Sequence, residues 1–148
     1  MAHAGYLTNV FVQANLKITV EKTLKELEPL KDSFDSIAFR GLSGGLIASI
    51  ICYQMKKGMV AVRKDKKIEA SHSQNKVESE TDNIGRFIIL DDQISSGTTV
   101  REMLKAITDM KLEGKCVGIY TYQGYTPRGS VWDPTGQQIP RIGSYVTP

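Results

Sequence analysis

Two adjacent carboxylates, Asp91 and Asp92, are the residues of this sequence whose type and position most clearly suggest chemistry. They follow residues 87–90, an apolar run rich in β-branched and aromatic residues, which is typical of a strand buried on both faces. Because burying an unpaired charge is costly, we expect the pair to lie at the carboxyl end of that strand. There it would face a polyol, a metal ion or cationic side chains.

Small residues follow the acidic pair and lead into a helical pattern: Ser95, Ser96, Gly97, Thr98 and Thr99. Free backbone N–H groups and the positive end of a helix bind anions, and the hydroxyls add further donors. This loop is therefore expected to hold a phosphate or another anion. The simpler alternative is an ordinary strand-turn-helix connection in which a Ser or Thr caps the helix.

A second candidate anion site is the segment 40–45, where Arg40 precedes Gly41 and other small residues. Backbone without bulky side chains lets an anion approach closely, although a tight strand-to-helix turn would need glycine too.

A third polar segment follows the next predicted strand and is rich in cations, which are Arg63, Lys64, Lys66 and Lys67, with His72 further along. Such cations could stabilise negative charge that grows on a leaving group. A run of charge is otherwise most often a solvated surface loop.

The hydrophobic pattern predicts the elements that must position these segments. Strands are expected at residues 36–39, 59–62, 87–90 and 116–122, and residues 10–12 are compatible with a short strand. Helices are expected at residues 20–28, capped by Thr19 and ended by Pro29, at 46–57, stopped by Gly58, and at 100–110, with Val100, Met103, Leu104 and Ile107 on one stripe. Residues 63–86 form a polar excursion long enough to require a functional explanation.

Alternating strands and helices predict an α/β fold with a mostly parallel central sheet flanked by helices. In such sheets ligands bind beyond the carboxyl ends of the strands. Each of the three polar segments follows a predicted strand, so we expect all three to converge on one edge of the sheet.

The length and composition of the chain are those of a single globular domain. The chain has 148 residues, 41% hydrophobic and 24% charged, with a net charge of +3 that suits an anionic small molecule but is too small to indicate nucleic acid. Cys52 and Cys116 are expected to be buried, reduced thiols. No signal peptide or membrane-spanning run is present, so a cytoplasmic location is expected.

The central segment, FIILDDQISSGTT, resembles the phosphoribosyl-pyrophosphate (PRPP) loop of the type I phosphoribosyltransferases, nearest to the orotate and adenine enzymes. That family has four apolar residues, an acidic pair, two further residues and a small-hydroxyl-Gly-x-Thr turn. Arg40 and Gly41 are similar to the pyrophosphate loop of the adenine branch, and the Arg63-Lys64 opening to the mobile catalytic loop. The resemblance covers about residues 36–122 and implies the type I fold over a core of about 19–122.

The resemblance implies a role for each segment. Asp91 and Asp92 would hold the ribose hydroxyls, directly or through Mg²⁺, which would ride on the pyrophosphate. The phosphate-binding and pyrophosphate-binding residues would be Arg40, Gly41, Ser95, Ser96, Gly97, Thr98 and Thr99. The catalytic cations would be Arg63, Lys64 and Lys67.

The activity implied is transfer of phosphoribose from PRPP to a nucleobase with release of pyrophosphate. Enzymes for 6-oxopurines commonly have an aspartate at the position of Ser95, so adenine, orotate or a related base is expected. The base would lie under a short irregular hood formed by residues 1–17 and 124–148, where Tyr122, Tyr125 and Trp132 could stack on it. Family members are usually homodimers, and the same is expected here.

Two alternatives stay open. Gln93 stands where the family has an apolar residue, and the hood is short, so the chain could be a regulatory protein that binds PRPP or a nucleotide without turnover. A P-loop nucleotide hydrolase is disfavoured because the chain has no G-x-x-x-x-G-K-[ST] motif.

Overall fold

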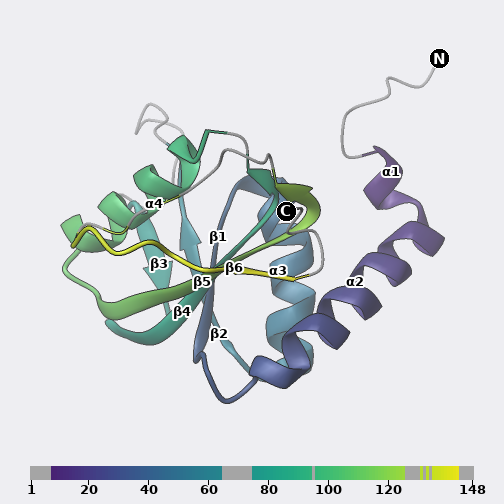
Figure 1. Ribbon diagram of the computed structural model, residues 1–148, viewed down its shortest axis with the longest axis horizontal. Coiled ribbons are helices and arrows are strands. Elements are labelled where there is room, and N and C mark those ends of the chain that lie inside the picture. The colour runs from purple at the N-terminus through teal and green to yellow at the C-terminus, as the bar shows by residue number, and fades with distance from the viewer. Residues whose placement is uncertain are drawn as a thin grey trace.

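The computed structural model describes residues 8–64, 75–94, 96–125, 131, 133 and 135–143. Within these residues one six-stranded sheet has the order β3-β2-β1-β4-β5-β6 (Figure 1). Its strands are β1 (Ser36–Arg40), β2 (Gly58–Val62), β3 (Val77–Ser79), β4 (Asn83–Ile94), β5 (Glu113–Tyr125) and β6 (Arg141–Ile142). The helices are α1 (Thr8–Phe11), α2 (Gln13–Leu27), the short 3₁₀ helix η1 (Glu28–Leu30), α3 (Gly41–Met55) and α4 (Thr98–Asp109). Neighbouring strands are parallel except for β2 and β3, so the predicted α/β fold is confirmed.

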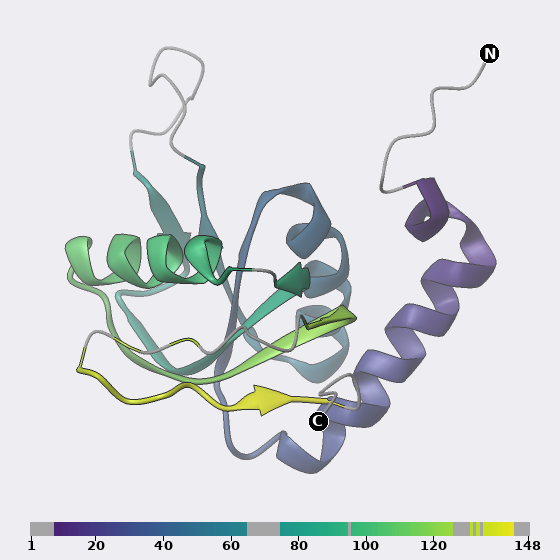
Figure 2. The same ribbon diagram turned by 45° about the horizontal axis from the view of Figure 1, so that its top comes forward.

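The helices cover the two faces of the sheet with separate apolar clusters (Figure 2). Phe87 and Ile89 of β4 belong to the cluster that contains the buried residues of α4, whereas Ile88 and Leu90 belong to the cluster that contains those of α2 and α3. Successive side chains of a strand point to opposite faces. The central strand is therefore buried on both sides, as the apolar run predicts.

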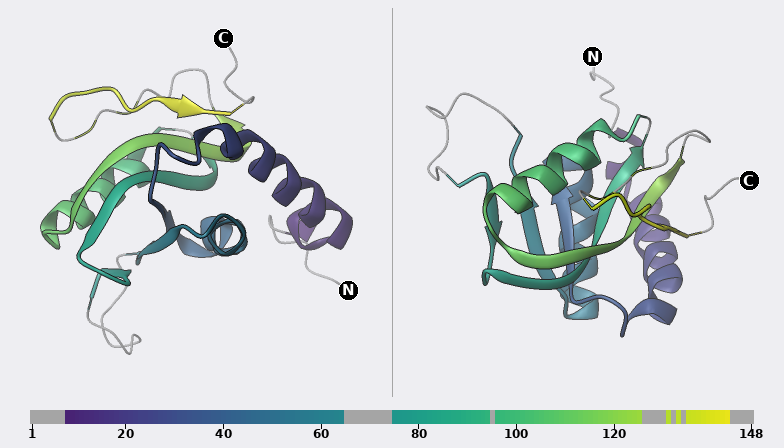
Figure 3. Two further views of the ribbon diagram at one scale, coloured as in Figure 1. Left: turned by 90° about the horizontal axis from the view of Figure 1, so that it is seen from below. Right: turned by 60° about the vertical axis from the view of Figure 1, so that its left-hand side comes forward.

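β4 and β5 are the longest strands and run side by side as two strongly curved ribbons (Figure 3). β4 continues two residues beyond the acidic pair to Ile94, so the pair lies near the carboxyl end of the strand, as predicted, but does not end it. The pairing with β5 continues through the pair, with a register shift between Asp91 and Gln93. Irregularities of this kind bend a strand and re-aim its side chains.

Of the helices that follow β1 and β4, α4 agrees with the prediction and α3 begins earlier than predicted. In α4 the predicted stripe of Val100, Met103, Leu104 and Ile107 is buried, as expected. α3 starts at Gly41, directly after β1, so the expected loop at residues 40–45 is the end of β1 and the first turn of this helix.

The end of α3 also differs from the prediction. Lys56, rather than Gly58, takes the left-handed conformation that ends the helix, with φ of 57°. Gly58 is the first residue of β2, where a methyl group would lie 2.9 Å from Ser36 Oγ. The close packing of two strands explains this glycine.

Residues 8–27 are almost entirely helical, whereas a short strand at residues 10–12 and a helix at residues 20–28 were expected. Val10 lies in α1, and α2 begins at Gln13 rather than at Val20. Thr19 is therefore inside α2, where its carbonyl accepts a hydrogen bond from Thr23 Oγ1, and it is not a cap. The predicted stop near Pro29 is confirmed, because α2 ends at Leu27 and Pro29 lies in η1.

Strands also occur in two segments expected to be irregular. β3 pairs with β2 inside the polar excursion at residues 63–86, and β6 adds a parallel strand next to β5 in the expected C-terminal hood. Of the polar excursion, residues 65–74 lie outside the described residues.

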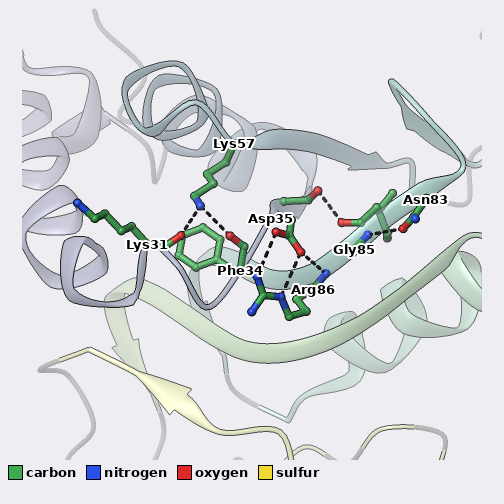
Figure 4. A network of polar contacts seen from close by, with 9 residues as sticks. Lys31, Phe34, Asp35, Lys57, Asn83, Gly85 and Arg86 are labelled. Atoms are coloured by element: carbon green, nitrogen blue, oxygen red, sulfur yellow. Dashed lines mark hydrogen bonds and ion pairs between the residues drawn. The ribbon is translucent and has the colours of Figure 1, made fainter.

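A polar network fastens the amino-terminal end of the sheet (Figure 4). Asp35 accepts hydrogen bonds from the Arg86 backbone N–H at 2.9 Å and from Arg86 Nε at 3.2 Å, which holds the pKa of that carboxyl below its usual value. Lys57 Nζ donates to the Phe34 carbonyl at 2.7 Å and to the Lys31 carbonyl. These contacts join the segment before β1 to β4 and to the end of α3, at the edge opposite the three polar segments.

Both cysteines are free and buried, as predicted, and burial raises the pKa of each thiol to about 12. Among the described residues, no helix is long and apolar enough to cross a bilayer.

The Gly114→Ala variant should lose about 2 kcal/mol of unfolding free energy, the range typical of an added methyl group that forces the backbone to shift. A methyl group at this position of β5 would lie 2.5 Å from Ile84 Cγ1 and 2.6 Å from the Gly85 carbonyl oxygen of β4. Urea denaturation measures the loss, with Glu113→Ala at the neighbouring exposed position as the control. An unchanged unfolding midpoint would show that β4 and β5 are not packed this closely.

Candidate functional site

The polar segments lie at the carboxyl ends of parallel strands, as predicted. Gly41 follows β1, Lys64 follows β2, and Asp91 lies near the end of β4. A methyl group at Gly41 would lie 3.1 Å from Lys64 Cε, and one at Gly44 would lie 3.7 Å from Asp91 Oδ1. The first turn of α3 therefore lies between the cation after β2 and the acidic pair.

The acidic pair is buried. Asp91 and Asp92 are 9% and 6% exposed. Asp91 Oδ1 accepts hydrogen bonds from the Asp92 backbone N–H at 2.8 Å and from Ser43 Oγ at 3.3 Å. Burial, followed by the neighbouring Asp92 side chain, raises the pKa of Asp91 to about 7. A carboxyl group with such a pKa can change its protonation state near neutral pH when a ligand arrives.

A turn at the start of α4 forms a small hollow. Gly97 has φ of 82° and is the N-cap residue of the helix. Ser96 Oγ lies 2.9 Å from Thr98 Oγ1 and accepts a hydrogen bond from the Thr98 backbone N–H at 3.4 Å. A cavity of about 50 Å³ is lined by Gln93, Ile94, Ser96, Gly97, Thr98, Thr99 and Val100. Backbone N–H groups of the first helical turn have no partner within the helix, so they can bind an anion there.

Arg40 does not point freely into this site. Its Nη1 donates to Glu102 Oε2 of α4, its side chain is only 12% exposed, and its Nε is buried without a hydrogen-bond partner among the described residues. Arg40 therefore connects the end of β1 to α4. Gly41 has φ of 74° and is the first residue of α3.

The predicted catalytic cations are placed differently from one another. Arg63 Nη2 lies 2.7 Å from Glu78 Oε2 of β3, so this guanidinium is paired within the β2-β3 hairpin. Lys64 is exposed, and its side chain extends past Gly41, where an added methyl group would lie 3.1 Å from Lys64 Cε. Lys67 and Ser95 lie outside the described residues, as do His72 and Trp132.

Tyr122 and Arg101 make contacts that the sequence analysis did not predict. Tyr122, expected to stack on a base, is 6% exposed and donates its hydroxyl to the Ser43 carbonyl at 2.8 Å, so its ring is part of the core. Arg101 donates to the Ser96 carbonyl and to Thr98 Oγ1. The contact of Arg101 with Thr98 could have been predicted from the sequence, because residues three positions apart are neighbours on a helix.

The protein alone offers few ligands for a metal ion. Among the described residues, no group of three or more His, Cys, Asp or Glu side chains is suitably arranged to hold one. Asp91 and Asp92 form only a pair, which fits an ion that takes its remaining oxygens from water and substrate, as Mg²⁺ commonly does.

The Asp91→Asn variant should be more stable than the wild type at pH 8 and similar to it at pH 4. The folded-state pKa of about 7 exceeds the ordinary value of 3.8, so the folded protein binds this proton more tightly than the unfolded chain. The stability due to Asp91 is therefore fully present below pH 4 and lost as the pH rises to 7. We expect a gain on the order of 2 kcal/mol at pH 8, measured by urea denaturation.

Asn can accept the same hydrogen bonds at Oδ1, so the comparison isolates the charge. The control is Asp82→Asn, at an exposed position directly before the amino-terminal end of β4. This variant should show no such pH dependence. A variant whose advantage is equal at pH 4 and pH 8 would contradict the burial of an ionisable carboxyl.

No protein-family model and no curated protein matches the sequence. Solved structures do match. Orotate phosphoribosyltransferase from Aeropyrum pernix is 14% identical, with a TM-score of 0.62 over 80% of this chain and 64% of that chain. Adenine phosphoribosyltransferase from Thermoanaerobacter pseudethanolicus is 22% identical, with a TM-score of 0.59 over 82% and 75%. UMP synthase from Leishmania donovani is 25% identical, with a TM-score of 0.59 over 76% and 23%.

The chain thus spans less than two thirds of the length of the Aeropyrum enzyme and about a quarter of the Leishmania protein. The neighbours share the mostly parallel sheet flanked by helices. The protein has the type I phosphoribosyltransferase fold.

Proposed function

We propose that this protein transfers a phosphoribosyl group from PRPP to a nucleobase and releases pyrophosphate. The observation that supports this most strongly is the buried pair Asp91 and Asp92, which lies beside the first turn of α3 and is followed by the hollow at Gly97. A phosphosugar has hydroxyls for the pair and a phosphate for the hollow. The likeness in fold to orotate and adenine phosphoribosyltransferases agrees with this reading.

In this proposal Asp91 and Asp92 accept hydrogen bonds from the ribose hydroxyls. The bond from C1′ to pyrophosphate breaks, a bond from C1′ to a ring nitrogen forms, and the base loses a proton. Positive charge develops on the sugar as the first bond breaks, and nearby carboxylates stabilise it. The 5′-phosphate lies in the hollow, bound by Ser96, Gly97, Thr98, Thr99 and, from outside the described residues, Ser95.

The leaving pyrophosphate gains negative charge during the reaction, so cations are needed on the other side of C1′. We assign this role to Lys64, because its Cε would lie 3.1 Å from a methyl group at Gly41, beside the first turn of α3. Arg63 would have to exchange Glu78 for pyrophosphate. Lys67 remains a proposed third cation, and Arg40 acts through the position of the Gly41 turn rather than by direct contact.

Mg²⁺ fits this site as an ion bound mainly by substrate oxygens, with Asp91 and Asp92 as its protein-side neighbours. When bound, it would neutralise part of the pyrophosphate charge.

The base remains adenine, orotate or a relative of these, since Ser95 replaces the aspartate expected for 6-oxopurines. The hood would come from residues 1–17, which include α1 and the start of α2, and from residues 124–148, which include β6. A panel of bases, each assayed for PRPP-dependent release of pyrophosphate, tests the proposal. Release with at least one base is the expected result.

A regulatory protein that binds PRPP without turnover is the second candidate. The observation that favours it is Gln93, an exposed polar residue that lines the hollow. Tight binding of PRPP and Mg²⁺ with no pyrophosphate released from any base would support the regulator and overturn the enzyme.

The Asp92→Asn variant should lower kcat by roughly a hundredfold or more, the effect of removing one preorganised electrostatic group. The unfolding free energy should change by no more than about 1 kcal/mol, because asparagine has the same shape as this buried aspartate and its Oδ1 can still accept hydrogen bonds. Pyrophosphate release and urea denaturation measure the two quantities. Wild-type kinetics in this variant would contradict a role for the pair in turnover.

The Lys64→Ala variant should reduce kcat at least tenfold while leaving the KM for PRPP within a few-fold, because its charge matters most as pyrophosphate departs. Arg63→Ala should act in the same direction. Lys115→Ala, an exposed lysine at the amino-terminal end of β5, is the matched control and should behave as wild type. Normal turnover in both the Lys64 and Arg63 variants would rule out the catalytic role of this segment.

A further inference from the structure

Arg101 lies one turn inside α4, and its guanidinium returns to the turn that precedes the helix. Nη1 donates to the Ser96 carbonyl at 3.2 Å and Nη2 donates to Thr98 Oγ1 at 3.2 Å. Helical side chains lean toward the N-terminus, which allows this geometry. One side chain thereby fastens both ends of the turn around Gly97.

Arg101 differs from three other arginines of the structure in that no carboxylate of the described residues pairs with its charge. Among the described residues, Arg40 pairs with Glu102, Arg63 with Glu78 and Arg86 with Asp35. Within the part of the chain that the structure describes, no carboxylate lies within salt-bridge distance of Arg101, and both of its acceptors are neutral oxygens.

Arg101 is exposed at the start of α4, where its charge adds to that of the helix end. The N-terminus of a helix carries a partial positive charge, so a cation there is repelled and an anion is attracted. A bound phosphate would face both the helix end and Arg101 and would be attracted by both.

Arg101 also determines which hydroxyl groups of the turn donate and which accept hydrogen bonds. Arginine can only donate, so Thr98 Oγ1 must accept from it. Ser96 and Thr98 have two hydroxyl hydrogens between them, and their mutual hydrogen bond at 2.9 Å uses one. The other hydrogen remains to be donated, which makes the pair a donor toward an anion in the adjoining hollow.

Gly97 is required by this arrangement as well as by its positive φ. A methyl group there would lie 3.1 Å from Arg101 Nη1 and 3.0 Å from Val131 Cγ2. Glycine therefore lets the guanidinium lie close to the backbone of the turn.

We infer that Arg101 is a positioning residue for the 5′-phosphate: it holds the Ser96–Thr98 turn in its anion-binding shape, and its unpaired charge favours the doubly ionised phosphate. The inference rests on the proposed function for the identity of the ligand. The recognition chemistry is that of a phosphate monoester, whose second ionisation lies near pH 6.

Titration calorimetry with ribose 5-phosphate tests the inference on the full chain at pH 5.5 and pH 7.5. The affinity of the wild type should rise with pH relative to that of Arg101→Gln as the phosphate becomes a dianion, whereas ionisation of Asp91 near pH 7 occurs in both proteins. Arg101→Gln should weaken binding roughly tenfold or more at pH 7.5, as expected for loss of charge-assisted hydrogen bonds, and should flatten the pH dependence. Arg101→Lys should restore the pH dependence but only part of the affinity, because lysine lacks the planar fork.

Lys105→Gln is the matched control, since it removes a cation one turn further along α4 that is paired with Asp109 at 2.7 Å. It should bind ribose 5-phosphate as the wild type does. Equal affinity in Arg101→Gln and the wild type, or weaker binding with an unchanged pH dependence, would overturn the inference. So would failure of the wild type to bind ribose 5-phosphate, which would remove the site altogether. Binding that follows the expected pattern without pyrophosphate release would overturn the transferase proposal alone.

Discussion

The burial of two ionisable carboxyl groups at the end of the central strand is the constraint on which the rest of this structure depends. A domain of this size gains stability by filling its interior with apolar side chains, and β4 does so on both faces up to Leu90. Asp91 and Asp92 interrupt that gain, and burial raises the pKa of Asp91. Buried polar groups need compensating hydrogen bonds, which the Ser43 hydroxyl and the Asp92 backbone N–H supply in part.

The surroundings of the pair follow from this constraint. α3 begins immediately after β1, which brings Ser43 next to Asp91, and Tyr122 holds the Ser43 carbonyl from β5. α4 begins soon after β4, which places its first turn and the adjoining hollow near the pair. Two helix starts and one strand end thus form a polar edge on a sheet that is otherwise apolar inside.

Much of the fold could be predicted because periodicity depends on neighbouring residues alone. The run at residues 87–90 and the stripe on α4 identify the central strand and its covering helix directly. Boundaries were less accessible, since they depend on partners far away in sequence: β4 extends through Asp91 because β5 pairs with it, and Lys56 rather than Gly58 ends α3 because Gly58 must pack against Ser36. The candidate site shows the same division. Residue types indicate Asp91 and Gly97, whereas the ion pairs of Arg40 with Glu102 and of Arg63 with Glu78 join residues on different elements and leave no pattern in the sequence.

Consecutive residues of α4 reach in different directions. Arg101 contacts the turn before the helix, and Glu102 contacts Arg40 at the end of β1. Neighbouring positions on a helix differ by about 100° in direction, so both contacts hold only at one rotation of the helix about its axis. Adding or deleting a residue in the preceding turn would rotate α4 and break the two attachments together. The length of this connection is therefore as constrained as its composition, and loop grafting at this edge of the sheet would have to preserve it.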